Sequence, residues 1–150
     1  MVPVTAPVEA AASQNLGKTG AVPFPSPKEI AAATDRVRAL CLALPETSER
    51  LSHGAPTFFV RGKKAFVMVL VDHHDDGIFG LWTAAPPGNQ ELLVAADPER
   101  FFRPPYVGHR GWLGVRLDRS VEWDEVAGIV EDAWATVAPK SLLASLGEDT

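Results

Sequence analysis

This sequence has few of the residues and patterns on which several classes of protein depend. Its one cysteine, Cys41, has no partner within the chain for an intramolecular disulfide. Its longest apolar runs, such as residues 65–71, fall far short of the ~20 residues that span a bilayer, so we expect no membrane association. Residues 1–20 lack a basic start followed by a compact apolar block, as a secretory leader would have. We therefore expect a soluble protein of the reducing cytoplasm.

Basic residues are too few for a protein that holds nucleic acid by its overall charge. The chain has 14 Lys and Arg against 19 Asp and Glu, for a net charge of -5 and a pI near 5.3. Phosphate binding through global electrostatics favours the opposite balance. The segment 50–71, however, contains no acidic residue and has as its basic residues Arg50, Arg61, Lys63 and Lys64. Positive charge is therefore local.

The length of 150 residues and the apolar content of 46% are those of one ordinary globular domain. Residues 1–25 are rich in Ala, Pro, Val and Thr and show no sustained period, so we predict a flexible N-terminal tail and a domain over residues 26–146. Ser26, Pro27 and Glu29 form a helix start, with a capping hydroxyl, a proline at the first position and a carboxylate that reaches back. This helix should extend to about Ala43, with Cys41 on its buried stripe.

The central part of the chain is typical of antiparallel strands. Residues 57–60 and 64–71 are β-prone and flank Arg61-Gly62-Lys63, which predicts a hairpin with a basic, solvent-facing tip. Residues 52–56 are interpreted as an irregular connector before the first strand. The polar turn 72–77 leads to a further strand over residues 78–83.

The second half of the chain predicts short helices, one strand and one long helix. Asn89 should cap a short helix to about Ala96, and residues 97–99 should start a helical turn that includes Phe101 and Phe102. The expected strand is 112–117 and the expected long helix 123–137, followed by a short segment near 141–146. We predict an α+β fold in which the N- and C-terminal helices cover one face of an antiparallel sheet.

Seven short segments resemble the MmcQ/YjbR family in order and spacing, over about residues 30–146. They are Leu44-Pro45-Glu46, residues 52–58, residues 61–64, residues 97–102, residues 104–108, residues 110–115 and Ala138-Pro139-Lys140. The resemblance implies a fold similar to that of the frataxin homologue CyaY, with a double-wing mode of DNA binding in which hairpins approach the duplex. It implies no reaction and no catalytic residue.

Cations near the predicted hairpin tip are the best candidates for phosphate contact, because flexible cations at a tip can reach a nucleic-acid backbone and tryptophan offers a stacking surface. We predict a small, non-enzymatic, nucleic-acid-associated module that binds DNA weakly and in a salt-sensitive way. The alternative is an ordinary solvated turn, since Lys and Gly are typical of exposed reversals. The DNA-contact residues predicted are Arg61, Lys63, Lys64, Arg110, Trp112 and Arg116.

A different hypothesis starts from large aromatic residues on the outer face of the predicted sheet. An apolar wall with a few convergent polar groups is typical of ligand sites, so the domain could instead bind a small anionic ligand or a protein. The competing interpretation is that the short helices and the loop 103–111 pack over these rings. The residues of this hypothesis are His53, Trp82, Tyr106, His109, Arg110 and Trp112.

Metal binding and catalysis find little support in the sequence. His73 and His74 are adjacent on a turn, where side chains seldom converge, and no histidine pair at helical i, i+4 spacing supports them. Ser52 beside His53 is only a sequence neighbour, whereas a catalytic triad needs three-dimensional geometry. Acidic residues within 122–132 invite comparison with the iron-binding surface of frataxins, but helix starts favour carboxylates anyway. We expect no enzyme, no metal and no cofactor.

Overall fold

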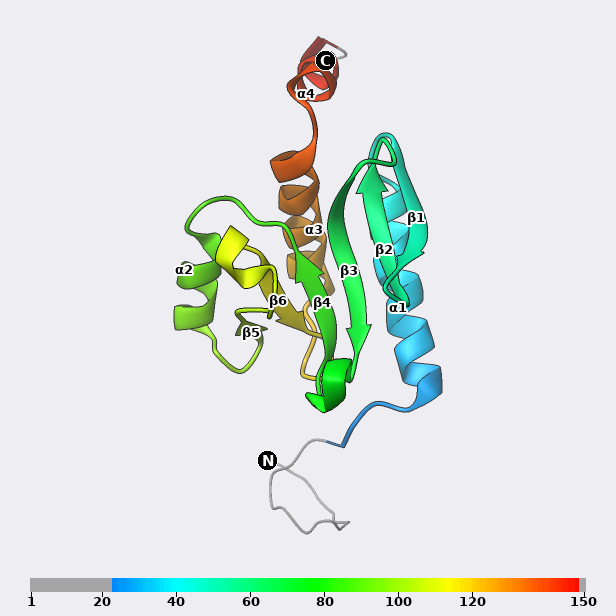
Figure 1. Ribbon diagram of the computed structural model, residues 1–150, viewed down its shortest axis with the longest axis vertical. Helices are drawn as coiled ribbons and strands as arrows, with labels where there is room; N and C mark the ends of the chain where they lie inside the picture. The colour runs from blue at the N-terminus through cyan, green and yellow to red at the C-terminus, as the bar shows by residue number, and fades with distance from the viewer. Residues whose placement is uncertain (1–22, 149–150) are drawn as a thin grey trace.

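The computed structural model describes residues 23–148, so nearly all of the predicted tail of residues 1–25 lies outside the described part. Six strands form one antiparallel sheet in the order β1-β2-β3-β4-β6-β5, as Figure 1 shows. Together with the helices, this confirms the predicted α+β class. The strands are β1 (Thr47–Ser52), β2 (Ala55–Val60), β3 (Lys64–Val71), β4 (Phe79–Thr83), β5 (Phe101–Phe102) and β6 (Leu113–Arg116).

The two longest helices, α1 and α3, lie on one face of this sheet, behind it in Figure 1. The shorter α2 lies beside β5, and α4 projects past the end of the sheet. The predicted cover by N- and C-terminal helices is thus confirmed. The helical elements are α1 (Pro27–Leu42), η1 (His73–Asp75), α2 (Asn89–Ala96), η2 (Gly108–Arg110), α3 (Trp123–Val137) and α4 (Lys140–Glu148). Within residues 23–148, no helix is both long enough and apolar enough to cross a membrane.

The start of α1 has the predicted capping box. The Ser26 hydroxyl accepts from the Glu29 backbone N–H at 3.1 Å, and the Glu29 carboxylate accepts from the Ser26 N–H at 2.8 Å. Val37 and Cys41 are fully buried, which confirms Cys41 as a core residue. Burial raises the pKa of the Cys41 thiol, so this group stays protonated.

The core lies between the sheet and these helices. Phe58, Leu81 and Val130 are fully or almost fully buried there. The β2–β3 pairing contains a bulge, in which Phe58 pairs with Val67 and Phe59 with Ala65, so that Phe66 has no partner in the register. The side chain of Phe66 is itself fully buried.

Two of the four tryptophans help to anchor the helical layer. Trp134 of α3 donates its indole N–H to the carbonyl of Pro45 at 3.0 Å, which ties α3 to the end of α1. The Arg36 guanidinium stacks over the ring of Trp123 at 4.5 Å. Both contacts lie at the helices and away from the strands that form the candidate site.

The structure corrects the predicted strand count. Residues 47–52 form β1, and His53-Gly54, with φ of 52° and 81°, close a two-residue hairpin into β2, where we predicted an irregular connector. Such a turn needs positive φ at both central residues, and histidine is an uncommon choice there. The polar segment Thr47–Ser52 also lacks the apolar alternation of a half-buried strand. Its side chains are half-buried or exposed because it lies at the sheet edge.

Two local predictions in the second half were also wrong. Residues 101–102 form the short strand β5 and not part of a helical turn. Phe102 pairs with Gly114, and this tertiary pairing overrides the local helical signal. Asn89 was expected to cap α2, but it is the first residue of that helix, and the N-cap is Gly88, in a left-handed conformation.

Candidate functional site

A groove with a cavity volume of about 1100 Å³ lies along the sheet, and Thr136 and Val137 at the end of α3 also line it. The alternation of side chains along the strands determines which residues form its floor. Residues two apart on a strand lie on the same face of the sheet, and so do directly paired residues. Met68 of β3 pairs with Trp82 of β4, and Phe59 of β2 pairs with Ala65 of β3, and all four line the groove. The groove therefore lies along β3.

An aromatic cluster stands at one end of this groove. The His73 ring meets the Trp82 ring edge-on at 4.9 Å and the Tyr106 ring at 5.9 Å. The Trp82 and Tyr106 centroids are 6.4 Å apart, and His74 contacts His73 at 4.1 Å. The turn η1 and the loop before η2 thus bring four rings from three segments together over the floor.

Three residues in the groove wall hold left-handed backbone conformations that non-glycine residues seldom adopt. These are His53, His74 and Tyr106, with φ of 52°, 50° and 66°. Such conformations persist only where the surrounding structure enforces them, and they are enriched at binding sites.

Positive side chains border the groove. Lys63 and Lys64 lie exposed at the tip of the β2–β3 hairpin. Arg110 also lines the groove, with its guanidinium 5.6 Å from the centre of the Trp112 ring. Nearby, Arg50 of β1 covers the ring of Phe59 at 3.6 Å. Among the described residues that line the groove, none is Asp or Glu. The groove therefore has the charge that attracts an anion.

The loop with Arg110 is held in place by a buried glutamine. Gln90 of α2, only 4% exposed, donates from its side-chain amide to the carbonyls of Gly108 and Trp112. These two bonds fix the backbone on both sides of Arg110. A side chain in this loop is thus presented by a rigid support.

Arg61, predicted to contact DNA, is engaged elsewhere. Its guanidinium forms an ion pair with Glu46 at 2.6 Å, and neither residue lines the groove. The hydrogen bond from Arg61 lowers the pKa of the Glu46 carboxyl below its usual value. Lys63 and Lys64, in contrast, have no ion-pair partner among the described residues.

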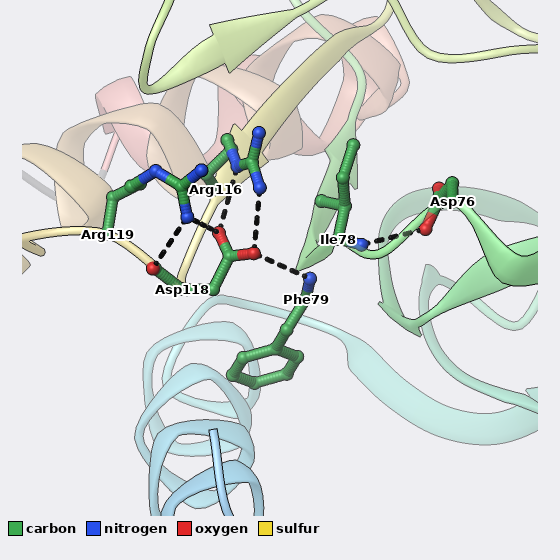
Figure 2. A network of polar contacts seen from close by, with 6 residues as sticks. All are labelled: Asp76, Ile78, Phe79, Arg116, Asp118 and Arg119. Carbon is green, nitrogen blue, oxygen red and sulfur yellow. Dashed lines mark hydrogen bonds and ion pairs between the residues drawn. The ribbon is translucent and has the colours of Figure 1, made fainter. Parts of the chain in front are cut away.

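Arg116, also predicted to contact DNA, is held in a network that Figure 2 shows. It donates two hydrogen bonds of 2.9 Å to the carboxylate of Asp118, which also accepts from the Phe79 backbone N–H at 3.3 Å. Burial raises the pKa of Asp118, but the hydrogen bonds from Arg116 and Phe79 outweigh this effect, and the pKa lies below its ordinary value. This arrangement ties β6 to β4 and leaves Arg116 outside the groove lining.

The structure divides the residues of the second hypothesis. Five of them line the groove: His53, Trp82, Tyr106, Arg110 and Trp112. His109 lies instead in a separate cavity of about 420 Å³ between α2 and η2. Trp82 and Trp112 are only 4% and 5% exposed, so the surrounding segments cover much of both rings.

Sequence reasoning missed several groove residues. His73 and His74 were considered only as metal ligands or as a solvated turn, but their rings pack within the aromatic cluster. Within residues 23–148, no three His, Cys, Asp or Glu side chains converge as a metal site would require. Phe59 and Met68 were also missed. The period of two along the strands could have placed them beside Trp82, but only with the correct pairing register.

Comparisons with known proteins bear on the fold and the family. A comparison with curated proteins finds no match. A crystal structure of the Deinococcus radiodurans protein DR2400, which has a DUF419 domain, is similar with a TM-score of 0.60 and 21% sequence identity, covering 72% of this chain and 80% of that one. At this identity the likeness shows the fold alone. The family model of YjbR matches residues 42–136, more than half of the chain, including the strands and loops that build the groove. The chain belongs to the YjbR family.

Proposed function

We propose that this domain is a non-enzymatic module that binds nucleic acid across the groove, with phosphates held by Lys63, Lys64 and Arg110. One observation supports this most directly. Cations from two segments far apart in sequence border a single groove, and none of its described lining residues is acidic. In a chain of net charge -5, such a surface is a locally positive region.

The ion pairs of the domain reduce the number of predicted DNA-contact residues that are free to bind phosphate. Arg61 and Arg116 each have a carboxylate partner within 3 Å, so contact with a phosphate would have to compete with Glu46 and Asp118. Lys63 and Lys64 need no such exchange. We therefore assign phosphate contact to the two lysines and Arg110, with Trp112 as the ring that supports Arg110.

We propose no catalytic step. The groove has imidazoles from His53, His73 and His74, but a general base is usually oriented by a further group such as a carboxylate, and the described lining supplies none. Binding alone is the function that these residues favour.

Titration of a labelled DNA by fluorescence anisotropy tests the proposal. The variant Lys63→Glu, Lys64→Glu should weaken binding at low salt by at least about tenfold, because two phosphate contacts become repulsive. The matched control is Lys28→Glu, Lys140→Glu, which changes the net charge equally at two exposed lysines outside the groove lining. Equal loss in both variants would contradict a groove-specific role, and no binding by the wild type at low salt would overturn the proposal.

A second candidate function is the binding of a small anionic ligand or of a protein side chain in the same groove. It is favoured by the two tryptophan floor rings, 4% and 5% exposed, at the base of a cavity of about 1100 Å³, a size suited to small molecules. Thermal-shift screening with anionic aromatic compounds tests it in the absence of nucleic acid. Stabilisation that Arg110→Ala abolishes, in a protein that fails to bind DNA, would favour this candidate.

A further inference from the structure

We propose that the groove recognises an unpaired nucleobase with its phosphate, so that the domain prefers single-stranded nucleic acid to a duplex. This inference rests on the proposed function and specifies its ligand. The shared chemistry is a flat aromatic base joined to an anionic group. A free nucleotide and a base within a strand both present it.

Exposure within the aromatic cluster identifies the ring available for stacking. Trp82 is 4% exposed and forms the floor, whereas Tyr106 is 66% exposed and stands above it. The His73 ring packs beside both, 4.9 Å from Trp82 and 5.9 Å from Tyr106. A base can therefore stack on Tyr106 without displacing any packed side chain, with the buried rings as an apolar backing.

The backbone holds Tyr106 in this position. Its φ of 66° is unfavourable for a tyrosine, and an exposed side chain gains little packing to offset that strain. The backbone of the same loop is fixed two residues further on, where Gly108 accepts from the buried Gln90. An exposed ring on a constrained backbone is pre-organised for contact with a ligand.

The cations lie at a suitable separation from this ring. The groove follows β3, whose eight residues run from Lys64 to Val71, just before His73. At about 3.3 Å per residue, Lys64 lies roughly 13 Å along β3 from Met68, the partner of Trp82, and roughly 23 Å from Val71 at the end of the strand. A strand several nucleotides long can place a base at Tyr106 and a phosphate at Lys63 or Lys64. In a duplex, paired bases are stacked inside the helix and present only their edges, so they cannot reach this ring.

The experiment compares three probes: a labelled oligothymidylate strand, its duplex with oligodeoxyadenylate, and thymidine monophosphate as an unlabelled competitor. We expect the strand to bind more tightly than the duplex. Tyr106→Ala should weaken strand binding by about five- to a hundred-fold, the usual range for loss of one base–aromatic stack, and should leave duplex binding unchanged. Tyr106→Phe should retain strand binding, since it keeps the ring.

Phe24→Ala is the matched control, because it removes an aromatic ring that is 44% exposed and lies outside the groove lining. Thermal melting of each variant verifies folding. Equal affinity for strand and duplex, with Tyr106→Ala unchanged but Lys63→Glu, Lys64→Glu weakened, would overturn this inference and leave the phosphate contacts standing. Absence of binding to every probe would overturn both proposals. Displacement of the oligothymidylate by thymidine monophosphate at a similar affinity would support the base site and identify a free nucleotide as its ligand.

Discussion

At the residue scale, His53 shows that a side chain in the groove lining can cost the fold stability. It occupies a left-handed position, with φ of 52°, in the two-residue turn between β1 and β2, and its side chain lines the groove. Asparagine and glycine are the residues that such a turn favours. A histidine at this position therefore gives up stability for a side chain at the end of the groove.

His53→Asn should raise the free energy of unfolding by about 0.5–1 kcal/mol, because asparagine relieves the strain of the left-handed turn. Urea denaturation followed by circular dichroism measures the change. His53→Ala serves as control, since alanine removes the imidazole without relieving that strain. A gain of stability in the alanine variant as large as in the asparagine variant would show that the imidazole itself is unfavourable.

Asp118 stabilises the fold through its ion pair with Arg116. Asp118→Asn should lower the free energy of unfolding at pH 7 by roughly 1.5–3 kcal/mol, the usual range for hydrogen bonds to charged groups. The side chain of Arg116 is only 19% exposed, so water replaces the lost partner poorly.

The same pair predicts a pH dependence. The pKa of Asp118 is lower in the folded protein than in the unfolded chain, so the ionised carboxylate stabilises the fold above about pH 4. This contribution is lost as the pH falls through the folded-state pKa. The stability difference between wild type and Asp118→Asn should therefore shrink on acidification below about pH 4. A difference that stays constant down to pH 2 in urea denaturation would contradict the assignment.

At the scale of elements, two glycines have opposite environments. Gly114 of β6 faces the ring of Phe102, and an added Cβ would lie 2.4 Å from that ring. Gly128 of α3 has no atom within 4 Å of the corresponding position. Gly114→Ala therefore requires the Phe102 ring or β5 itself to move, whereas Gly128→Ala meets open space.

Gly114→Ala should lower the free energy of unfolding by about 1–3 kcal/mol through overpacking. Gly128→Ala should raise it by up to about 1 kcal/mol, because alanine is favoured over glycine inside a helix. Thermal unfolding of the two variants, measured side by side, checks both signs. A stable Gly114→Ala variant would mean that Phe102 moves aside at little cost.

The elements also show what sequence patterns can and cannot predict. The capping box at Ser26 and the basic turn at Arg61-Gly62-Lys63 were predictable, because both depend on residues close together in the chain. Strand β1 was not predictable, because a polar edge strand is held by its backbone hydrogen bonds to β2 and needs no apolar pattern. The strand at Phe102 was not predictable either, because it depends on pairing with Gly114. Local patterns contain no information about such partners.

The candidate site, like the fold, was predictable only in part from the sequence. Period-two alternation pointed to aromatic residues on the outer sheet face, and the basic hairpin tip was visible in the sequence. The ion pairs of Arg61 with Glu46 and of Arg116 with Asp118 depend on side-chain geometry, which residue spacing does not supply. The packing of His73 against Trp82 and Tyr106 likewise joins segments that only the fold brings together.

At the scale of the whole molecule, the net charge of -5 opposes association with a polyanion except through the groove. Three phosphate contacts, by Lys63, Lys64 and Arg110, predict a plot of log affinity against log salt with a slope of about -2 for a single strand. Each lysine replaced by alanine should reduce the magnitude of that slope by about 0.7. Anisotropy titrations at several salt concentrations give both values, and a slope near zero would exclude phosphate contact as the main source of affinity.

The placement of the tryptophans gives the protein two separate optical reporters. Trp82 and Trp112 line the groove, whereas Trp123 and Trp134 contact Arg36 and Pro45 in the helical layer. Quenching of intrinsic emission by a bound base should therefore affect only the first pair, while the emission shift on unfolding involves all four. Occupancy of the groove and loss of the fold can then be followed in one unlabelled sample, as two distinct spectral changes.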